Sequence, residues 1–384
     1  MSKRKPIKAN RKPKIVRDKN WKTRVLEGQL DPDLEMPRVG RVLPRGLEEG
    51  KVKRWVKVES ELTLADTAQV EMPPLPEGWR EGTVIRVSTG LYHVDLENQV
   101  TICSVRGTLT ATDTGYTNVV AVGDRVWVSD QGTQGQVIER VLPRRSVLAR
   151  PDVKNPDLSQ IIVANVDQLL IISSWTEPDP WLEFIDRSLI AAAQGKMKPL
   201  ICLNKVDLAA NIRECRKEMK IYRDLGYDVL FTSATTGYGI DTLRNRLIGH
   251  STAVVGLSGV GKSSLLMAVQ PDLELRVNQV SEASGLGRHT TTQVALLKLN
   301  EGGYVVDTPG LRELGLITVR RYELALYFPE ILALAGQCRF NDCTHLVEPD
   351  CAVIQAVEQG QIASSRYASY EAIYNSLPEY YTES

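Results

Sequence analysis

A glycine-rich segment offers the most specific chemistry in the chain. Residues 256–263 read Gly-Leu-Ser-Gly-Val-Gly-Lys-Ser and match the phosphate-binding pattern G-x-x-x-x-G-K-[ST] in full. A strand is predicted before it and a helix after it, so its backbone N–H groups would face phosphate at a helix N-terminus. Lys262 is expected to reach the β- and γ-phosphates and Ser263 to bind Mg²⁺. A chance turn is the alternative, which the flanking elements disfavour. The predicted contacts are Gly256, Leu257, Ser258, Gly259, Val260, Gly261, Lys262, Ser263 and Ser264.

A second motif indicates which base the nucleotide carries. Residues 204–207 read Asn-Lys-Val-Asp directly after the apolar run 199–203. The Asp207 carboxylate can accept from guanine N1–H and from the exocyclic N2 amine, and adenine offers no such pair of donors. The motif is weak alone and strong beside a phosphate loop. Residues 232–234, Thr-Ser-Ala, follow the next predicted strand and would bring a backbone N–H near guanine O6. The predicted base-site residues are Asn204, Lys205, Val206, Asp207, Ser233 and Ala234.

Two further segments predict contacts to Mg²⁺ and to the γ-phosphate. Residues 307–310 read Asp-Thr-Pro-Gly after a short apolar strand. Asp307 is expected to hold the Mg²⁺ shell through water, and the Gly310 N–H to sense the γ-phosphate. Residues 287–292 read Gly-Arg-His-Thr-Thr-Thr, and one of these threonines is the natural switch ligand for Mg²⁺. Thr291 is favoured, with its neighbours as alternatives.

The order of these motifs differs from that of conventional P-loop GTPases. Conventional chains begin with the phosphate loop and end with the base loops, whereas here residues 204–207 and 232–234 come first. A sheet can keep its arrangement if the old termini are joined and a new break is opened. The pattern therefore predicts a circularly permuted GTPase. The new break follows residues 307–310, so the region that moves on hydrolysis leads straight into the C-terminal segment.

Three cysteines and a histidine crowd together near the C-terminus. Cys338, Cys343, His345 and Cys351 form the spacing C-x4-C-x-H-x5-C. Three thiolates and an imidazole suit a closed, tetrahedral, structural zinc site, and one zinc per chain is expected. The alternative is three ordinary core cysteines and a surface histidine. Six cysteines in 384 residues predict no disulfide framework, and the cytoplasm is the expected compartment.

The net charge of zero hides a basic N-terminal arm. Eleven lysines and arginines lie between Lys3 and Arg24, opposed only by Asp18, so the rest of the chain carries about ten net negative charges. Such an arm suggests an anionic partner, most simply nucleic acid. A disordered solubilising tail and a targeting segment are the alternatives. No apolar run is long enough to cross a membrane, and no membrane partner is expected.

Changes in composition and periodicity predict a multidomain chain. Residues 1–75 are predicted to be a basic, largely disordered arm and linker, with a short strand at 52–58 as an option. Short alternating strands in residues 76–150 predict a small all-β barrel; an OB-type barrel fits the size, although the pattern does not separate it from an SH3-like barrel. Residues 151–318 alternate strands with helices, as in an α/β sheet. Residues 319–384 are predicted to be a small helical domain around the cysteines.

Taken together, the motifs give the chain a family resemblance. From about residue 79 to the C-terminus it resembles the circularly permuted, ribosome small-subunit-dependent GTPases of the RsgA/YjeQ family, on the motifs quoted above. The resemblance implies an OB barrel, a permuted GTPase domain and a C-terminal zinc domain. It also implies binding to the small ribosomal subunit and its rRNA in late maturation, with hydrolysis of GTP to GDP and phosphate stimulated by that subunit. A monomer is expected.

The catalytic group is the least conventional feature. The position after residues 307–310 is Leu311, which cannot orient water as a glutamine does there in Ras-like enzymes. His289 is the candidate replacement, and the family's pattern has histidine at that place. The alternatives for His289 are an exposed loop residue or an rRNA contact. A small-molecule P-loop kinase is disfavoured by residues 204–207 and 307–310. A structural RNA-binding protein that keeps nucleotide without turnover also stays open.

Overall fold

The computed structural model describes residues 73–88, 91–97, 99–107, 109, 118–132, 135–151, 159–273, 294–307 and 319–377. Almost all of the predicted arm and linker, with the optional strand at 52–58, lies outside these residues. In the described part of the chain, no helix is long and apolar enough to span a membrane.

Five strands close into a barrel. Strand β1 pairs antiparallel with both β2 and β4, which closes the sheet on itself. The order β1-β2-β3-β5-β4, with β3 and β5 parallel, is that of an OB-type barrel, which settles the choice against the SH3-like alternative. Apolar side chains such as Val84, Val94 and Ile138 fill the interior. The strands are β1 (Trp79–Ser88), β2 (Leu91–Leu96), β3 (Gln99–Val105), β4 (Arg125–Asp130) and β5 (Gln136–Val141).

A short hairpin follows the barrel. Strands β6 (Val147–Pro151) and β7 (Ser159–Ala164) pair antiparallel in a sheet of their own. The hairpin was not anticipated from the sequence pattern. The predicted domain boundary between residues 150 and 151 falls inside β6, which pairs with β7. The exact position of that boundary stays a prediction.

The central sheet is predominantly parallel. Its order is β10-β9-β8-β11-β13-β12, in which only β12 runs antiparallel to its neighbour, and β12 also pairs with β1 of the barrel. Strand β8 is buried along its whole length, as expected of a parallel strand covered on both faces. The strands are β8 (Gln168–Ser174), β9 (Lys198–Asn204), β10 (Asp228–Phe231), β11 (Ser251–Gly256), β12 (Ala295–Lys298) and β13 (Tyr304–Asp307).

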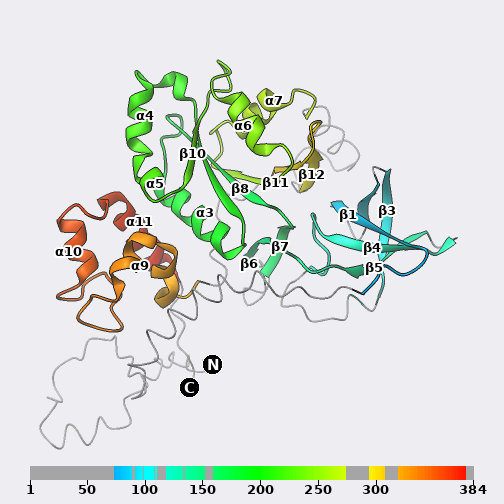
Figure 1. Ribbon diagram of the computed structural model, residues 1–384, viewed down its shortest axis with the longest axis horizontal. Helices are drawn as coiled ribbons and strands as arrows, with labels where there is room; N and C mark the ends of the chain where they lie inside the picture. The colour runs from blue at the N-terminus through cyan, green and yellow to red at the C-terminus, as the bar shows by residue number, and fades with distance from the viewer. Residues whose placement is uncertain are drawn as a thin grey trace, which may run out of the picture. The chain divides into compact units, whose positions relative to one another are not determined.

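Helices cover both faces of this sheet (Figure 1). Successive residues of β8 point to opposite faces, so Leu169 joins one core cluster and Leu170 the other. Side chains of α3, α4 and α5 fill the first cluster, and those of α6 and α7 the second. The helices are α3 (Leu182–Gln194), α4 (Ile212–Glu218), α5 (Lys220–Asp224), α6 (Ile240–Leu247) and α7 (Lys262–Val269).

The sheet order explains how a permuted chain keeps a GTPase core. The phosphate-loop strand β11 lies between β8 and β13, which precede and follow it by a long stretch of sequence. Neighbours in a sheet are set by hydrogen bonding and by burial, and neither depends on where the chain begins. The predicted fold class is therefore confirmed, with the base-loop strands ahead of the phosphate-loop strand along the chain.

The C-terminal segment is helical and has a core of its own. Phe328, Ile331, Tyr370 and Ile373 are central to it, and Ile190 of α3 joins the same cluster. The ring of Phe328 meets that of Tyr370 edge to face at 5.3 Å. Its elements are the 3₁₀ helix η4 (Arg321–Tyr327), α9 (Pro329–Ala335), α10 (Ala352–Glu358) and α11 (Ser364–Ser376).

A buried ionic network joins this segment to the GTPase core. Arg366 of α11 is 2% exposed and pairs with Asp186 of α3, which is 1% exposed. Its Nε donates to Glu330 of α9 at 2.7 Å, and its guanidinium lies 4.5 Å from the centre of the Phe328 ring. The Tyr222 hydroxyl donates to the same Asp186 oxygen at 2.8 Å. Burial raises the pKa of Asp186, and Arg366 offsets that effect.

Replacing Arg366 with Met should destabilise the chain strongly. Removing one partner of a buried ion pair leaves the other charge unpaired, which typically costs about 3–5 kcal/mol. Urea unfolding followed by circular dichroism would measure the loss. A second change, Asp186→Asn, should recover part of it because it removes the stranded charge.

Arg125→Met is the matched control for that variant. Arg125 pairs with Glu81 at the surface, where such pairs contribute about 0–1 kcal/mol. Equal stability of Arg366→Met and Arg125→Met would contradict the role assigned to the buried network.

Candidate functional site

The predicted nucleotide residues meet at one edge of the sheet. The carboxyl ends of parallel strands share an edge, and ligands of open α/β sheets bind there. The register places Ser174 beside Asn204, Gly256 beside Ile172, and Asp307 beside Val254. The loops that follow β8, β9, β11 and β13 therefore come together, although the chain reaches them in a permuted order.

The phosphate loop is shaped by its glycines, and its lysine donates hydrogen bonds to backbone oxygens of the same loop. Gly261, the N-cap of α7, has a φ of 91°, and a Cβ there would lie 2.5 Å from Asn204 Nδ2. Only glycine fits this position without strain. Lys262 Nζ donates to the carbonyl oxygens of Gly256 and Leu257 at 2.9 Å each. The next two side chains, those of Ser263 and Ser264, are exposed at the first turn of α7.

The Asn204 side chain ties the base loop to the phosphate loop. Asn204 is 2% exposed, and its Nδ2 donates to the backbone oxygen of Val260 at 2.9 Å. Its Oδ1 accepts from the Thr232 hydroxyl at 3.3 Å, and its backbone oxygen accepts from Trp175 N at 2.9 Å. Four loops are thus held together by one asparagine, so the predicted base and phosphate contacts belong to one site.

The rest of the base loop turns outward. Lys205 adopts a left-handed conformation with φ of 60°, which reverses the chain at the end of β9. Val206 is buried and anchors the 3₁₀ helix η3 (Val206–Leu208), whereas Asp207 is exposed with its carboxylate accessible. Buried Val206 thus holds the loop in place, while the exposed Asp207 carboxylate can accept hydrogen bonds from a ligand.

The companion loop is rigid at Ser233 and open at Ala234. Ser233 is fully buried, and its hydroxyl accepts from the Thr236 N–H at 3.1 Å. Its own N–H donates to the Tyr238 oxygen at 2.9 Å. These bonds indicate that Ser233 shapes the turn, whereas the half-buried Ala234 stands where a backbone N–H can reach a base.

Several predicted residues fall outside the described part of the chain. They are the predicted catalytic residue, the favoured switch threonine and two residues that follow β13: His289, Thr291, Gly310 and Leu311. Of Asp307 only the backbone is described. The backbone of Asp307 ends β13 at the same edge as the phosphate loop, which is compatible with its predicted place near Mg²⁺.

The segment after β8 is a part of the site that sequence reasoning missed. Lys205 Nζ donates to the backbone oxygen of Glu177, and Pro178 lies 3.5 Å from the position of a Cβ on Gly259. The missed signal was positional. Residues 175–178 follow the buried strand β8, which ends at the same edge of the sheet as the base loop.

The four predicted metal ligands come together in the structure. Their donor atoms all lie within 4.8 Å of one another. Cys338 Sγ lies 3.8 Å from Cys351 Sγ, and His345 Nδ1 lies 3.5 Å and 3.6 Å from those two sulfurs. Ligands at tetrahedral angles around zinc are separated by about 3.8 Å for two sulfurs and about 3.6 Å for sulfur and nitrogen. Cys338, Cys343, His345 and Cys351 can therefore hold a metal ion such as zinc.

The loop that carries these ligands is held by polar contacts. Glu348 accepts from the Thr344 N–H at 2.7 Å, from the Thr344 hydroxyl at 2.6 Å and from the Leu346 N–H at 3.1 Å. Burial opposes ionisation of Glu348, yet these bonds lower its pKa to about 2. The Tyr367 hydroxyl of α11 donates to the His345 backbone oxygen at 2.8 Å. None of these supporting residues was anticipated from the sequence.

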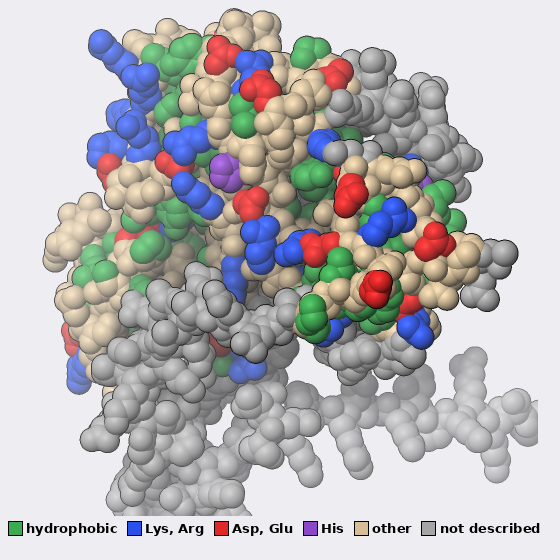
Figure 2. Space-filling view, turned by 45° about the vertical axis from the view of Figure 1, so that its right-hand side comes forward, with side chains coloured by type: hydrophobic (Ala, Val, Ile, Leu, Met, Phe, Trp, Pro, Cys, Tyr) green, Lys and Arg blue, Asp and Glu red, His purple; other side chains and the backbone are tan. Residues whose placement is uncertain are grey.

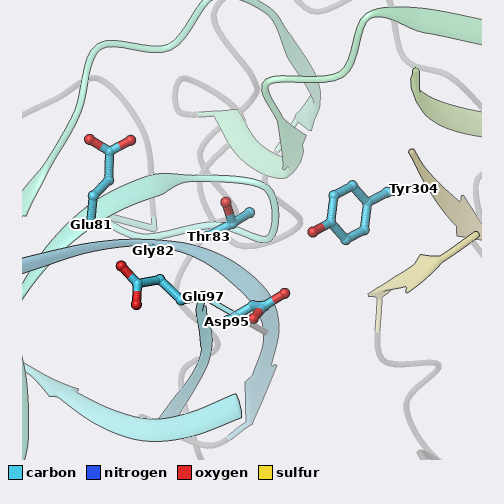
Figure 3. A pocket seen from close by; sticks show the side chains of 6 residues that line it. All are labelled: Glu81, Gly82, Thr83, Asp95, Glu97 and Tyr304. Carbon is cyan, nitrogen blue, oxygen red and sulfur yellow. The ribbon is translucent and has the colours of Figure 1, made fainter. Parts of the chain in front are cut away.

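A cavity of about 290 Å³ lies at the other end of β13 (Figure 3). It is lined by Glu81, Asp95 and Glu97 of the barrel and by Tyr304, the first residue of β13. Burial and the charge of Asp95 raise the pKa of Tyr304, whose hydroxyl bonds to Asp95. Three carboxylates in one cavity would repel a triphosphate, so this cavity is not a nucleotide site.

Comparison with known proteins agrees with this geometry. The model of the RsgA GTPase family matches residues 141–317. The small ribosomal subunit biogenesis GTPase RsgA of Moorella thermoacetica is 43% identical over 290 residues, which cover 76% of this chain and 94% of that protein. The crystal structure of YjeQ from Thermotoga maritima is 36% identical, with a TM-score of 0.61 over 77% of this chain and 98% of that one. The structure of YloQ, a circularly permuted GTPase, is 29% identical, with a TM-score of 0.60 over 80% of this chain and 100% of that one. On its motifs, its permuted sheet and these similarities, the chain belongs to the RsgA family of GTPases.

Proposed function

We propose that the chain binds GTP with Mg²⁺ and hydrolyses it to GDP and phosphate when stimulated by the small ribosomal subunit, during late maturation of that subunit. The observation that carries the nucleotide part is the bond from Asn204 to Val260, which makes a guanine-reading loop and a phosphate loop into one site. The relatives named for small ribosomal subunit biogenesis support the choice of partner. We expect this chain to act in the cytoplasm, as a monomer.

Each loop has a proposed contact on the nucleotide. Asp207 accepts from guanine N1–H and N2, Lys205 covers the face of the base, and the Ala234 N–H meets O6. Lys262 exchanges its bonds to the loop carbonyls for bonds to the β- and γ-phosphates. The backbone N–H groups of residues 257–264 surround the phosphates at the start of α7, where the helix favours negative charge.

Magnesium and the switch segments complete the proposed mechanism. Ser263 and Thr291 would hold Mg²⁺, Asp307 would contact its bound water, and the Gly310 N–H would sense the γ-phosphate. The metal ion would neutralise charge on the phosphates. His289 orients the attacking water, because Leu311 offers no hydrogen-bonding group in the place of a catalytic glutamine. Hydrolysis is then slow until a partner orders the loop that carries His289.

The cysteine cluster has a structural role in this proposal. Zinc bound by Cys338, Cys343, His345 and Cys351 would hold the loop between α9 and α10 closed. Three thiols and one imidazole form a complete donor set without an open coordination position. Burial raises the pKa of Cys343 and Cys351, so a bound cation is needed to keep these sulfurs deprotonated together.

Two regions of the chain are proposed to meet rRNA. OB barrels bind oligonucleotides on the face of their second and third strands, and β3 presents Val100 and Ile102, each 55% exposed. The basic arm would add contacts to phosphates. Under this proposal residues 1–75 are the arm and linker, 76–150 the OB barrel, 151–318 the GTPase domain, and 319–384 the zinc domain.

The proposed function is tested by GTP turnover with isolated small subunits, with large subunits and with neither. Small subunits alone should raise the rate, because they order the switch loop. Equal rates in all three mixtures would refute stimulation by the small subunit. Binding of GTP without turnover under every condition would favour the structural RNA-binding alternative.

His289→Ala should leave GTP affinity nearly unchanged and sharply reduce the turnover that small subunits stimulate. Removal of one positioned catalytic group typically costs about 10²–10⁴ in rate. Single-turnover hydrolysis with saturating small subunits would measure the effect, and GTP titration of the same variant serves as its control. Full stimulated turnover in His289→Ala would assign the water-positioning role to another group.

Asp207→Asn should weaken GTP binding and favour xanthine nucleotide. The substitution exchanges a carboxylate for an amide, so an acceptor facing guanine N1–H and N2 is replaced in part by a donor. Equilibrium titration with guanine and xanthine nucleotides would measure the change. Unaltered GTP affinity would disprove the role given to Asp207 in base recognition.

Cys343→Ser should abolish metal binding and unfold the C-terminal segment while sparing GTP binding. The metal contributes folding free energy directly to a small domain. Native mass spectrometry of the parent should find about one zinc per chain. Cys215→Ser is the control, because Cys215 is buried in the GTPase core and should leave the metal content unchanged. A well-folded parent chain that binds no zinc would contradict the assignment.

A further inference from the structure

Helices α4 and α5 present a continuous face to solvent. They act as one helix, because the Met219 N–H donates to the Cys215 oxygen at 3.1 Å and the Arg223 N–H donates to the Met219 oxygen at 3.3 Å. Cys215, Met219 and Tyr222 are fully buried and pack this helix onto the sheet. Directions around the helix therefore carry through the junction at Met219, and the buried side fixes which residues face outward.

Five cations line one side of this helix. They occupy positions i, i+3, i+4, i+7 and i+10, which lie along a single face. Lys and Arg side chains gather at the upper left of the molecule in Figure 2, where α4 and α5 lie in Figure 1. All five are exposed: Arg213, Arg216, Lys217, Lys220 and Arg223. We call these five residues the basic stripe.

The acidic residues of the helix do not neutralise the stripe. Glu214 and Glu218 stand four residues apart on a second exposed face, and Asp224 pairs with Lys220. Within the described ranges, the other four cations of the stripe form no ion pair with a carboxylate. The stripe therefore keeps a concentrated positive charge along about 15 Å of helix.

Helix stability alone does not explain the stripe. Cations near a helix C-terminus are favourable, which accounts for Arg223 in the last turn of the combined helix. Arg213 lies in the first turn of the combined helix, where a positive charge gains nothing from the helix dipole. The other three cations lie in the middle of the helix, where the dipole has little effect: Arg216, Lys217 and Lys220. A ligand with repeated negative charges would explain all five positions together.

We propose that the basic stripe is a further RNA-binding surface of this chain, which contacts the phosphate backbone of helical ribosomal RNA. The inference rests on the proposed function, because that function supplies an RNA partner. The stripe contains no aromatic side chain on which an unpaired base could stack. Cations without base-reading groups position a protein on an RNA helix through phosphates and carry no sequence specificity.

The test compares Arg213→Gln/Arg216→Gln/Lys217→Gln with the parent chain. Glutamine keeps helix propensity and removes charge. Binding is measured at several salt concentrations, both to isolated small subunits and to a synthetic RNA duplex of 20 base pairs. Each lost phosphate contact flattens the log–log salt dependence by roughly 0.7–0.9, so the triple variant should lose about 2–3 from the slope on both ligands.

Two controls separate charge from structure. Glu214→Gln/Glu218→Gln changes the neighbouring acidic face of the same helix and should leave binding as tight as in the parent or slightly tighter. Arg213→Lys/Arg216→Lys keeps the charge and should retain the parent slope. Basal GTP turnover and GTP affinity should be unchanged in all variants, because the stripe lies outside the nucleotide loops.

The outcomes distinguish this proposal from the proposed function. An unchanged slope in the triple variant on the duplex would overturn the RNA-binding surface. If the triple variant loses salt dependence on small subunits but not on the duplex, the partner of the stripe is an acidic ribosomal protein. That result would also overturn the RNA-binding surface. If the parent binds the duplex through the stripe but small subunits do not bind or stimulate it, the surface stands and the proposed function fails.

Discussion

The hydrogen bond from the Asn204 amide to the Val260 carbonyl is the contact on which the nucleotide site depends. It joins the loop after β9 to the loop after β11 at 2.9 Å, inside a region closed to solvent. In a buried setting such a bond is strong, and loss of one partner leaves a polar group without compensation. Gly261 is part of the same constraint, since a Cβ there would occupy the space of the Asn204 amide. The loop of residues 204–207 and the phosphate loop are therefore one structural unit, which does not depend on the order of the two loops along the chain.

Permutation moves the chain ends and leaves the sheet neighbours in place. In this order β13 is the last strand of the core, and the chain continues from it to a C-terminal segment packed on α3. Ile190 supplies the apolar part of that contact and Asp186 the ionic part, through Arg366. An ion pair in such a place contributes less to net stability than its attraction suggests, because both charges lose their hydration. Its two partners instead favour one way of placing α11 on α3, since any displacement exposes an unpaired charge to an apolar core.

Sequence alone predicted the parts of the site that are local in the chain. The phosphate loop and residues 204–207 each combine a fixed pattern with a flanking strand, so their positions in the fold followed from the strand ends. The cysteine cluster was predictable from its spacing alone, because all four residues lie within one short loop. Contacts made by isolated side chains from distant segments were not predictable in this way. Arg366 and Asp186 are 180 residues apart, and Glu177 meets Lys205 through its backbone, to which the sequence gives no clue. The hairpin of β6 and β7 was missed because its two strands are not separated by a short turn motif that would predict a hairpin.

Three contacts and the chain between them connect the metal cluster, α11, α3 and the base loop. The Tyr367 hydroxyl holds the backbone at His345, and the preceding residue, Arg366, binds Asp186 of α3. The residues that lead into α3 include Glu177, whose backbone oxygen accepts from Lys205. The Arg366–Asp186 contact is buried, so it cannot shift without leaving a charge unpaired, whereas the contact of Lys205 with Glu177 lies at the surface. A metal ion at the cysteines would therefore support the placement of α11 on α3, whereas the nucleotide loops are held together by their own contacts with Asn204.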